Sequence, residues 1–507
     1  WKVWLDTLGS KQGAMQVDAR DGTHPVIVPI HDILQAGNSF DTITYSKGQA
    51  VIRMLEAYVG EAAFRSGVRH YMKDYAYGNT ETDQLWAEVD AASDRKLTSV
   101  AHDFTLRPGV PMLTVSPAGN GISLSQERFA YDASGDAGGA WKVPALVQPS
   151  SGSDPLAIIR VENEAGHPSL LPGAPAGSVV NAGQTAYFRV RYEGKAFDAL
   201  CGRFGTLTPD DQIGIINDAY SIGTAGKEPM SELLRLSERL PANAYPSVWT
   251  TLVARLTYLD QAYDGQAGQP AFRRFVTEVT SPVLRRIGLE AVPGESANAE
   301  IERTDLLGLL GRIGDPAVVG WAKGKFTAFL KEPSSISGTE RITVLRIVAV
   351  NPDLGTWESL HSLEVNAPSG IEKDQYVDLV GAASDLGLAQ RALDASLTGE
   401  MEPTLRPQIV SDVSRRHSLM ALNFAIQHWD ELKQFIEPTI WARYVPRLAS
   451  NSFDDSVLGP LEAYAGSHIP VSAQQGVHTA ESQVRFAAAV RAQRLPEIDR
   501  WLATRAQ

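Results

Sequence analysis

Residues 40–60 read FDTITYSKGQAVIRMLEAYVG, and they carry the strongest structural signal in the first part of the chain. Its second half repeats apolar residues every three or four positions, which is the pattern of a helix with one buried face. The apolar positions are Ala50, Val51, Met54, Leu55 and Tyr58. Gly48 lies just inside the start, and Gly60 follows as a stop signal. We therefore predict a helix over residues 47–59, with Tyr45 directly before it.

Helical patterns surround this stretch through most of the first 110 residues. A second helix is expected from Glu61 to Tyr75, and a third from Thr82 to Ala92 with Thr82 as its N-cap residue. The segment GAMQV, residues 13–17, is interpreted as a helical turn that leads to Asp18. We expect residues 1–110 to form one helical domain.

The hydrophobic period changes at residues 108–111, which read PGVP. Beyond them, short runs alternate apolar and polar residues, as half-buried strands do. These runs include residues 113–115, 122–124, 143–147, 156–161 and 186–192. Loops rich in glycine and proline separate them. We predict a small β-sandwich domain over residues 111–194.

Helical patterns return at about Lys195 and persist to Gln507. The clearest start is TPDD, residues 208–211, with a capping threonine, proline at the first helical position and an acidic residue at the third. Apolar stripes at helical spacing recur, for example over residues 306–313 and 484–495. They are typical of stacked helical hairpins, although no fixed-period motif identifies a named repeat. We predict a superhelical α domain over residues 195–507, which makes the chain mainly α.

The overall composition is that of a globular protein with several domains. The 507 residues, 43% of them hydrophobic, exceed what one hydrophobic core holds. A net charge of −13 argues against nucleic acid or an anionic membrane as a partner, because both attract clustered lysine and arginine. The single cysteine, Cys201, excludes an intrachain disulfide. No apolar run predicts a membrane span. We expect a soluble protein, with cytoplasm and periplasm both open as its compartment.

The common catalytic motifs are absent from the chain. It contains no HExxH, no GxSxG nucleophile elbow, no P-loop and no dinucleotide-binding fingerprint. Serine hydrolase, phosphoryl transfer and nicotinamide chemistry therefore lack support. No two of the ten histidines have i, i+4 spacing, and the closest pair is His24 and His31. We expect no metal ligand and no cofactor-binding residue within these 507 residues.

An ordered series of short matches resembles one known family. The series contains THP at residues 23–25, FDTITYSKG at 40–48, RML at 53–55, LW at 85–86 and RPGVP at 107–111. It resembles the aminopeptidase N family of gluzincin zinc metallopeptidases. Residues 1–110 carry the specific part. Later segments, such as WKVP at 141–144 and YFRVRY at 187–192, match with decreasing specificity.

The resemblance implies an architecture and a chemistry. Residues 1–110 would be the C-terminal part of a thermolysin-like catalytic domain, followed by the β-sandwich and a large HEAT-like superhelical domain. Zinc would be held by an HExxH helix and a glutamate outside this chain, so we expect a further segment upstream of Trp1. Tyr45 matches the family's catalytic tyrosine, whose protonated phenol stabilises the tetrahedral intermediate. GAMQV imitates the family's substrate strand but lacks its glutamate, and we assign it no substrate role.

Two hypotheses about function follow. In the first, the chain is the C-terminal portion of a zinc aminopeptidase that removes N-terminal residues from peptides, inactive alone and active when joined to its upstream segment. In the second, it is a non-catalytic relative or a helical scaffold for protein contacts, since stacked helical hairpins commonly present binding surfaces. Tyr45 favours the enzyme, because a scaffold has no need of that phenol.

Overall fold

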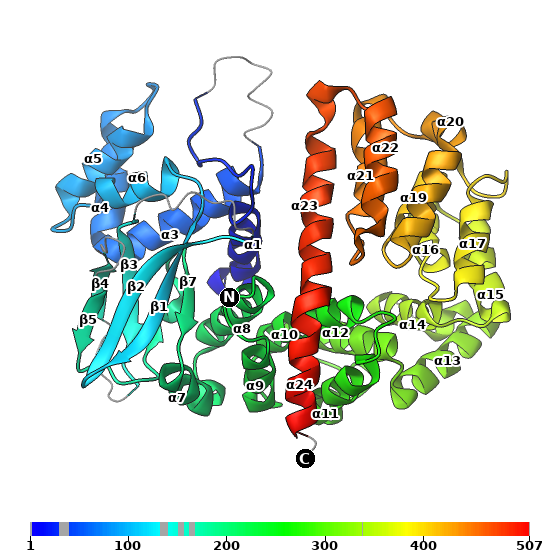
Figure 1. Ribbon diagram of the computed structural model, residues 1–507, viewed down its shortest axis with the longest axis horizontal. Coiled ribbons are helices and arrows are strands. Elements are labelled where there is room, and N and C mark those ends of the chain that lie inside the picture. The colour runs from blue at the N-terminus through cyan, green and yellow to red at the C-terminus, as the bar shows by residue number, and fades with distance from the viewer. Residues whose placement is uncertain are drawn as a thin grey trace. The chain divides into compact units, whose positions relative to one another are not determined.

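Figure 1 shows the computed structural model, which describes residues 3–29, 40–131, 140–150, 157–161, 168–336 and 338–505. The chain divides into two compact units, residues 1–252 and 253–507. The first unit combines helices with two small sheets, and the described residues of the second form helices. The chain is therefore mainly α-helical with small sheets, as predicted. The domain borders at residues 110 and 194 stay predictions.

The first part of unit 1 is helical. Its elements are α1 (Val3–Asp18), a π-helix η2 (Ile43–Lys47), α3 (Gly48–Val59), α4 (Glu61–Asp74), α5 (Thr82–Ala92) and α6 (Thr98–Thr105). The predicted helix after Tyr45 is confirmed as α3, which buries the five expected apolar residues. GAMQV lies within α1, so its helical interpretation is also confirmed.

The predicted N-cap of α5 is wrong by one residue. Glu81, and not Thr82, is the N-cap residue. Its side chain accepts from the backbone of Gln84, whose Oε1 accepts in turn from the backbone N of Glu81 at 2.7 Å. This reciprocal capping box satisfies two backbone N–H groups, whereas a single hydroxyl satisfies one.

Two small sheets follow in unit 1 (Figure 1). The first has the order β5-β2-β1-β7 and the second the order β4-β3-β6. The strands are β1 (Val110–Ala118), β2 (Gly121–Phe129), β3 (Val143–Gln148), β4 (Ala157–Val161), β5 (Ser169–Pro172), β6 (Val179–Val180) and β7 (Arg189–Tyr192). Pairing is antiparallel except between β1 and β7, where Met112 lies opposite Arg189. Because β1 lies inside its sheet, residues 110–115 are all buried, and the expected alternation is lost there.

The strand predicted over residues 186–192 begins only at Arg189. The backbone of Ala186 forms its hydrogen bonds with the side chains of Asn181 and Lys11, where a strand would bind a neighbouring strand. Its N–H donates to Oδ1 of Asn181 at 2.9 Å, and its carbonyl accepts from Nδ2 of Asn181 at 3.1 Å and from Nζ of Lys11 at 3.2 Å. The prediction is therefore wrong for the first three residues.

Helix α1 is held by a buried polar network. Nζ of Lys11 donates to the carbonyl of Gln184 at 2.8 Å as well as to Ala186. Beside it, Nη1 of Arg189 donates to Oδ1 of Asp218 at 3.1 Å. Burial lowers the pKa of Lys11 to about 7 and raises the pKa of Asp218 to about 6. The network ties α1 to the segment before β7 and to α8 (Pro209–Thr224).

The remaining elements are helical. Unit 1 also contains α7 (Lys195–Arg203), α8 and α9 (Ser231–Arg239), and α10 (Pro246–Ala262) crosses the border between the units. Unit 2 contains α11 (Gln269–Ile287), α12 (Ala297–Ile313), α13 (Pro316–Lys331), α14 (Gly338–Val350), α15 (Leu354–Val365), α16 (Gly370–Val380), α17 (Leu386–Ala395), α18 (Arg406–Ser414), α19 (Ser418–Gln427), α20 (Trp429–Leu432), α21 (Trp441–Ala449), α22 (Leu458–His468), α23 (Gln475–Ala489), a π-helix η11 (Val490–Arg494) and α24 (Leu495–Arg505). Short 3₁₀ turns are η3 (Ala182–Gln184), η4 (Phe204–Thr206), η5 (Pro333–Ser335), η6 (Pro403–Leu405), η7 (Lys433–Phe435), η8 (Pro438–Ile440), η9 (Asp455–Val457) and η10 (Val471–Ala473).

The start of α8 agrees with the prediction from TPDD. Thr208 is the N-cap residue, its side chain accepts from the backbone N of Asp211, and Pro209 is the first helical residue. None of the helices within the described ranges combines the length and the apolar character needed to cross a membrane.

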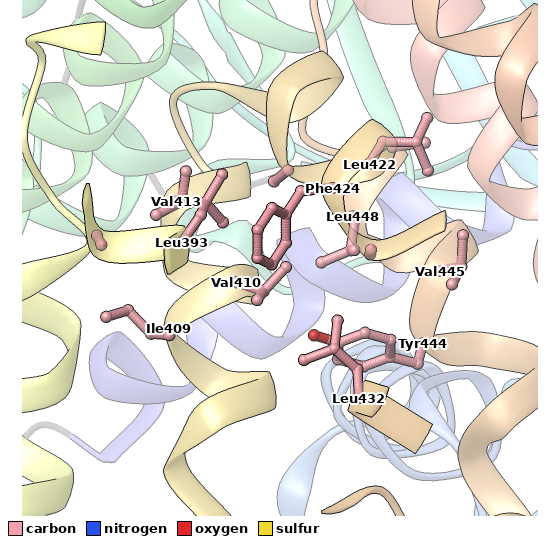
Figure 2. Packing of buried hydrophobic residues seen from close by; sticks show 14 of the residues in the cluster. Leu393, Ile409, Val410, Val413, Leu422, Phe424, Leu432, Tyr444, Val445 and Leu448 are labelled. Carbon is pink, nitrogen blue, oxygen red and sulfur yellow. The ribbon is translucent and has the colours of Figure 1, made fainter. Parts of the chain in front are cut away.

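Figure 2 shows the apolar core between the later helices of unit 2. Leu393 comes from α17, Val410 from α18, Phe424 from α19 and Val445 from α21, so four helices meet in one cluster. Tyr444 also lies in this cluster, and its hydroxyl donates to the carbonyl of Pro407 at 2.7 Å. The buried phenol therefore carries no unsatisfied polar group into the core.

Helices α4 and α5 of unit 1 approach each other closely at Gly67, and a substitution there tests the contact between these two helices. A Cβ atom added at Gly67 would lie 2.5 Å from Cα of Val89. We expect Gly67→Ala to lower the free energy of unfolding by about 1–3 kcal/mol, because the steric clash outweighs the helix-propensity gain of about 1 kcal/mol. Gly13→Ala in α1 is the matched control, since a Cβ there meets nothing within 4 Å. Thermal unfolding followed by circular dichroism should rank Gly67→Ala lowest, and equal melting temperatures would contradict the close approach.

Candidate active site

Tyr45 lies in the middle of the π-helix η2 and points away from the core. Ile43 and Lys47, at the two ends of this single turn, are buried, whereas Tyr45 is 60% exposed. Its hydroxyl makes no hydrogen bond to any residue within the described ranges. The ring of Phe40 lies nearby, with the two centroids 6.2 Å apart. Single π-helical turns are frequent at functional sites, because they project a side chain out of the regular helix pattern.

Asp41 holds the first residues of this turn. Its Oδ1 accepts from the backbone N of Thr44 at 2.9 Å, and its carbonyl accepts from the backbone N of Tyr45 at 3.1 Å. Its other carboxylate oxygen, Oδ2, lies 2.6 Å from Nε2 of His24. The backbone conformation at Tyr45 therefore depends on one carboxylate, and that carboxylate depends on His24.

The contacts of His24 define its protonation state. Nε2 faces the carboxylate of Asp41, and Nδ1 lies 2.7 Å from the carbonyl of Pro25. Both partners are acceptors, so both ring nitrogens must carry a proton for both hydrogen bonds to form. His24 is accordingly an imidazolium in this arrangement.

The pKa shifts of the pair agree with that geometry. Partial burial by itself lowers the pKa of His24, but the hydrogen bonds to Pro25 and Asp41 and the charges of Asp41 and Asp18 outweigh it and raise the pKa. Partial burial by itself raises the pKa of Asp41, and the hydrogen bonds from Thr44 and His24 outweigh it and lower the pKa. The ion pair is therefore favoured between weakly acidic and neutral pH.

A fully buried ion pair anchors the other end of the turn. Nζ of Lys47 lies 2.8 Å from Oδ2 of Asp18, and both side chains are 0% exposed. Nζ also donates to the carbonyl of Arg107 at 3.1 Å. Burial lowers the pKa of Lys47, and the adjacent carboxylate of Asp18 opposes that shift. An ion pair this deep is stable only when its remaining hydrogen-bonding positions are also filled.

Asp18 fills those positions with donors from three further segments. Oδ1 accepts from Oγ1 of Thr23 and from the backbone N of Gly109, both at 2.7 Å. Oδ2 accepts from the hydroxyl of Tyr187 at 3.2 Å. Burial first, and then the charge of Asp18, raises the pKa of Tyr187 well above its ordinary value, so this phenol stays a donor. Asp18 thus joins the end of α1, the turn with Tyr45, the start of β1 and the segment before β7.

The sequence singled out Tyr45 but missed the three groups that position it. Lys47 carried a usable signal, because it lies four residues before Val51 and hence on the buried face of the helix. A charged residue at such a position needs a buried partner. Asp18 and the pair of His24 with Asp41 gave no comparable signal, since their partners are distant in the sequence.

The described residues do not fit a zinc site. No three histidine, cysteine, aspartate or glutamate side chains come together among residues 3–29, 40–131, 140–150, 157–161, 168–336 and 338–505. His24 and Asp41 form only a pair, and their nitrogen and oxygen atoms are occupied by each other, by Pro25 and by Thr44. His31 lies outside the described residues.

Comparisons with known proteins place both units in the context of one group of peptidases. The family model described as "Peptidase family M1 domain" matches residues 1–104, and the one described as "ERAP1-like C-terminal domain" matches residues 178–485. The second match alone covers more than half of the chain.

Three curated proteins with similar sequences include two aminopeptidases. Aminopeptidase 2 of Candida albicans is 28% identical over 385 residues, covering 74% of this chain and 41% of that protein. Aminopeptidase M1-A of Oryza sativa subsp. japonica is 24% identical over 502 residues, covering 96% of this chain and 57% of that protein. Tricorn protease-interacting factor F2 of Thermoplasma acidophilum is 30% identical over 236 residues, covering 46% of this chain and 29% of that protein. The chain spans about half the length of the aminopeptidases it matches.

A substitution of Asp18 tests whether its buried ion pair with Lys47 stabilises the turn that carries Tyr45. We expect Asp18→Asn to destabilise the π-helix and α3 by about 3–5 kcal/mol, because it leaves the ammonium group of Lys47 buried without an anion. Hydrogen exchange measured by mass spectrometry should show faster exchange in peptides from residues 40–59, with peptides from α18 and α19 in unit 2 as an internal reference. Glu61→Gln is the matched control, since its ion pair with Arg65 is exposed and contributes about 1 kcal/mol or less. Equal exchange in the two variants would contradict the role of Asp18.

The protonation of His24 can be measured by NMR titration of its ring signals. A pKa that is raised in the folded state gives a stability contribution that is complete below the unfolded value of 6.5 and is lost as pH rises through the folded value. We expect a midpoint above 6.5 for His24, and a lower midpoint in Asp41→Asn, where the carboxylate is removed but the shape is kept. His24→Gln assigns the signal. A midpoint at or below 6.5 in the unmodified chain would show that the ion pair does not hold.

Proposed function

Because this chain belongs to the aminopeptidase N (M1) family, we propose that it forms the C-terminal portion of a zinc-dependent aminopeptidase that removes N-terminal residues from peptides. Tyr45 is its catalytic residue in this proposal. The zinc ligands lie outside these 507 residues in this proposal, because the sequence contains no HExxH motif. The chain alone is inactive in this proposal, and its substrates are peptides with a free N-terminus.

One observation carries the assignment of Tyr45. Its phenol is exposed and unpaired among the described residues, while the backbone that bears it is held at both ends. Asp41 binds the beginning of the turn, and Lys47 binds its end to the buried carboxylate of Asp18. A donor on a fixed backbone with no competing partner is suited to stabilise charge that develops on a substrate oxygen.

The chemical role of Tyr45 follows from the phenol group. During attack on a peptide carbonyl, the oxygen of that carbonyl gains negative charge. A protonated phenol donates a hydrogen bond to this oxygen, and it does so without reorganising, because its backbone is already in place. The interaction is stronger with the charged intermediate than with the neutral substrate, so it raises the turnover rate more than the substrate affinity.

The proposal also covers the architecture. Residues 1–110 act as the C-terminal part of a thermolysin-like catalytic domain, residues 111–194 as a β-sandwich and residues 195–507 as a HEAT-like superhelical domain. The match of the ERAP1-like C-terminal domain to residues 178–485 supports the last of these. The succession of helices from α11 to α24 is compatible with stacked hairpins.

Replacing Tyr45 tests the proposed function. In the complete enzyme, we expect Tyr45→Phe to lower the turnover number on aminoacyl-arylamides by about 100- to 1000-fold, with little change in KM. Thermal unfolding should be unchanged, because the hydroxyl has no partner among the described residues to lose. Tyr71→Phe is the matched control, since its hydroxyl contacts Oγ1 of Thr80 at the surface of α4. Unchanged turnover with altered stability would refute the catalytic role and favour a non-catalytic scaffold.

A further inference from the structure

Unit 2 contains a cavity of about 480 Å³ at the N-terminal end of α19. Its walls come from the loop between α18 and α19, the loop after α21 and the π-helix η11. Cavities of a few hundred cubic ångströms are the usual size of small-molecule sites. This one combines charged residues with apolar ones, and no residue of unit 1 lines it.

Arg416 is the most informative residue of this cavity. Its side chain is half-buried, and among the described residues it has no hydrogen-bond or ion-pair partner. Burial and then the charge of Arg312 lower the pKa of Arg416 to about 10, and the charges of Asp264 and Asp260 oppose this shift through space. A guanidinium group that is half-buried and has no partner loses part of its hydration without replacement, while its nitrogens stay accessible to a ligand in the cavity.

The nearby carboxylates already have other partners. Asp260 accepts from Nε of Arg273 at 2.7 Å and from Nε of Arg312 at 2.8 Å. Asp264 accepts from Nη2 of Arg312 at 2.6 Å. These four residues form a closed network with two positive and two negative charges. Among the residues that the structure describes, neither Asp260 nor Asp264 pairs with Arg416, because each already pairs with other arginines.

Arg491 adds a second positive charge to the cavity wall. It lies in the π-helix η11, and its Nε donates to the carbonyl of Ala262 at 2.9 Å. Its guanidinium stacks over Phe453, 5.4 Å from the ring centroid. The lining carboxylate that remains is Asp454, whose Oδ1 accepts from the backbone N of Ser456 at 2.9 Å. Arg416 and Arg491 against Asp454 leave one positive charge in excess.

The other ionisable residues of the wall do not cancel this charge. Arg415 is paired with Asp412, with Nη2 and Oδ1 3.1 Å apart. Nε2 of His417 lies 3.0 Å from the carbonyl of Ala383 and donates to it, and burial lowers the pKa of this histidine, so it is neutral at physiological pH. Leu386, Leu419 and Phe453 contribute apolar surface to the wall, and the uncharged polar lining residues include Asn423, Asn451 and Ser452.

We propose that this cavity binds a small organic anion, whose carboxylate or phosphate group pairs with Arg416 and whose short apolar body lies against Leu419 and Phe453. The single positive charge in excess selects a monoanion over a neutral molecule. The planar guanidinium of Arg416 matches the geometry of both oxyanions. The residues that line the cavity all belong to unit 2, and the 507-residue chain is used to test the proposal.

Calorimetric titration of the 507-residue chain with sodium isovalerate tests the proposal. Isovaleramide, which has nearly the same shape and no charge, is titrated in parallel at the same ionic strength. We expect saturable binding of isovalerate, and binding of the amide weaker by about 10- to 100-fold, the range for a hydrogen bond to a charged group. Inorganic phosphate is the third probe. A dissociation constant for phosphate at or below that of isovalerate supports the site and identifies a bare oxyanion as its ligand.

Two variants localise the binding. Arg416→Gln should weaken isovalerate binding by about 10- to 100-fold, as expected for the loss of a hydrogen bond to a charged group. The melting temperature should not fall, because the substitution breaks no hydrogen bond or ion pair among the described residues. Arg485→Gln is the matched control. It removes a positive charge from α23, where Arg485 pairs with Glu481 at the surface, and it should bind as the unmodified chain does. Equal affinities for acid and amide, unchanged binding in Arg416→Gln, or no saturable binding of either oxyanion would each overturn the proposal.

Discussion

The buried ion pair between Asp18 and Lys47 is the constraint on which the region around Tyr45 depends. Two opposite charges with no exposure to water are favourable only in a narrow geometry, because each must recover its lost hydration from the other and from neighbouring dipoles. Asp18 recovers it from Thr23, Gly109 and Tyr187, and Lys47 from the carbonyl of Arg107. Moving any one of these segments would leave a charge unsatisfied. The pair therefore defines the mutual positions of α1, the π-helix and the first strand.

Buried polar networks stabilise the region around α1 in unit 1, whereas apolar packing stabilises the later helices of unit 2. Around α1, buried polar networks connect distant segments, as the contacts of Lys11 and of Asp218 show. In the later helices of unit 2, an apolar cluster joins helices that include α17, α18, α19 and α21, and the buried phenol of Tyr444 has a carbonyl partner (Figure 2). Apolar packing tolerates small shifts, whereas a buried hydrogen-bonded network requires specific distances and angles. A hydrogen-bond donor such as the phenol proposed to contact a substrate oxygen is positioned more accurately by a buried hydrogen-bonded network than by apolar packing.

Tyr45 and Arg416 carry two of the polar groups that have no side-chain partner among the described residues. The phenol of Tyr45 is exposed on a backbone that is held at both ends, and the guanidinium of Arg416 lines a cavity whose neighbouring carboxylates are already paired. Each group keeps hydrogen-bonding capacity that a ligand at its position would use, the phenol toward a substrate oxygen and the guanidinium toward an anion. The two groups lie in different units and support separate proposals about substrate chemistry and anion binding.

Patterns in the amino-acid sequence predicted most of the local elements quoted above and the family. The apolar spacing from Ala50 to Tyr58 predicted α3, the cap at Thr208 predicted the start of α8, and the change of period at PGVP preceded the first strand. FDTITYSKG pointed to Tyr45. These features depend on the backbone geometry of adjacent residues, which a short stretch of sequence specifies. Long-range packing brings Lys47 to Asp18 and His24 to Asp41. It also lets Asn181 and Lys11 bind the backbone of Ala186, so that β7 begins only at Arg189, and it leaves Arg416 without a side-chain partner among the described residues. Such pairings join residues far apart in the chain, and they depend on how whole elements pack, which no local pattern encodes.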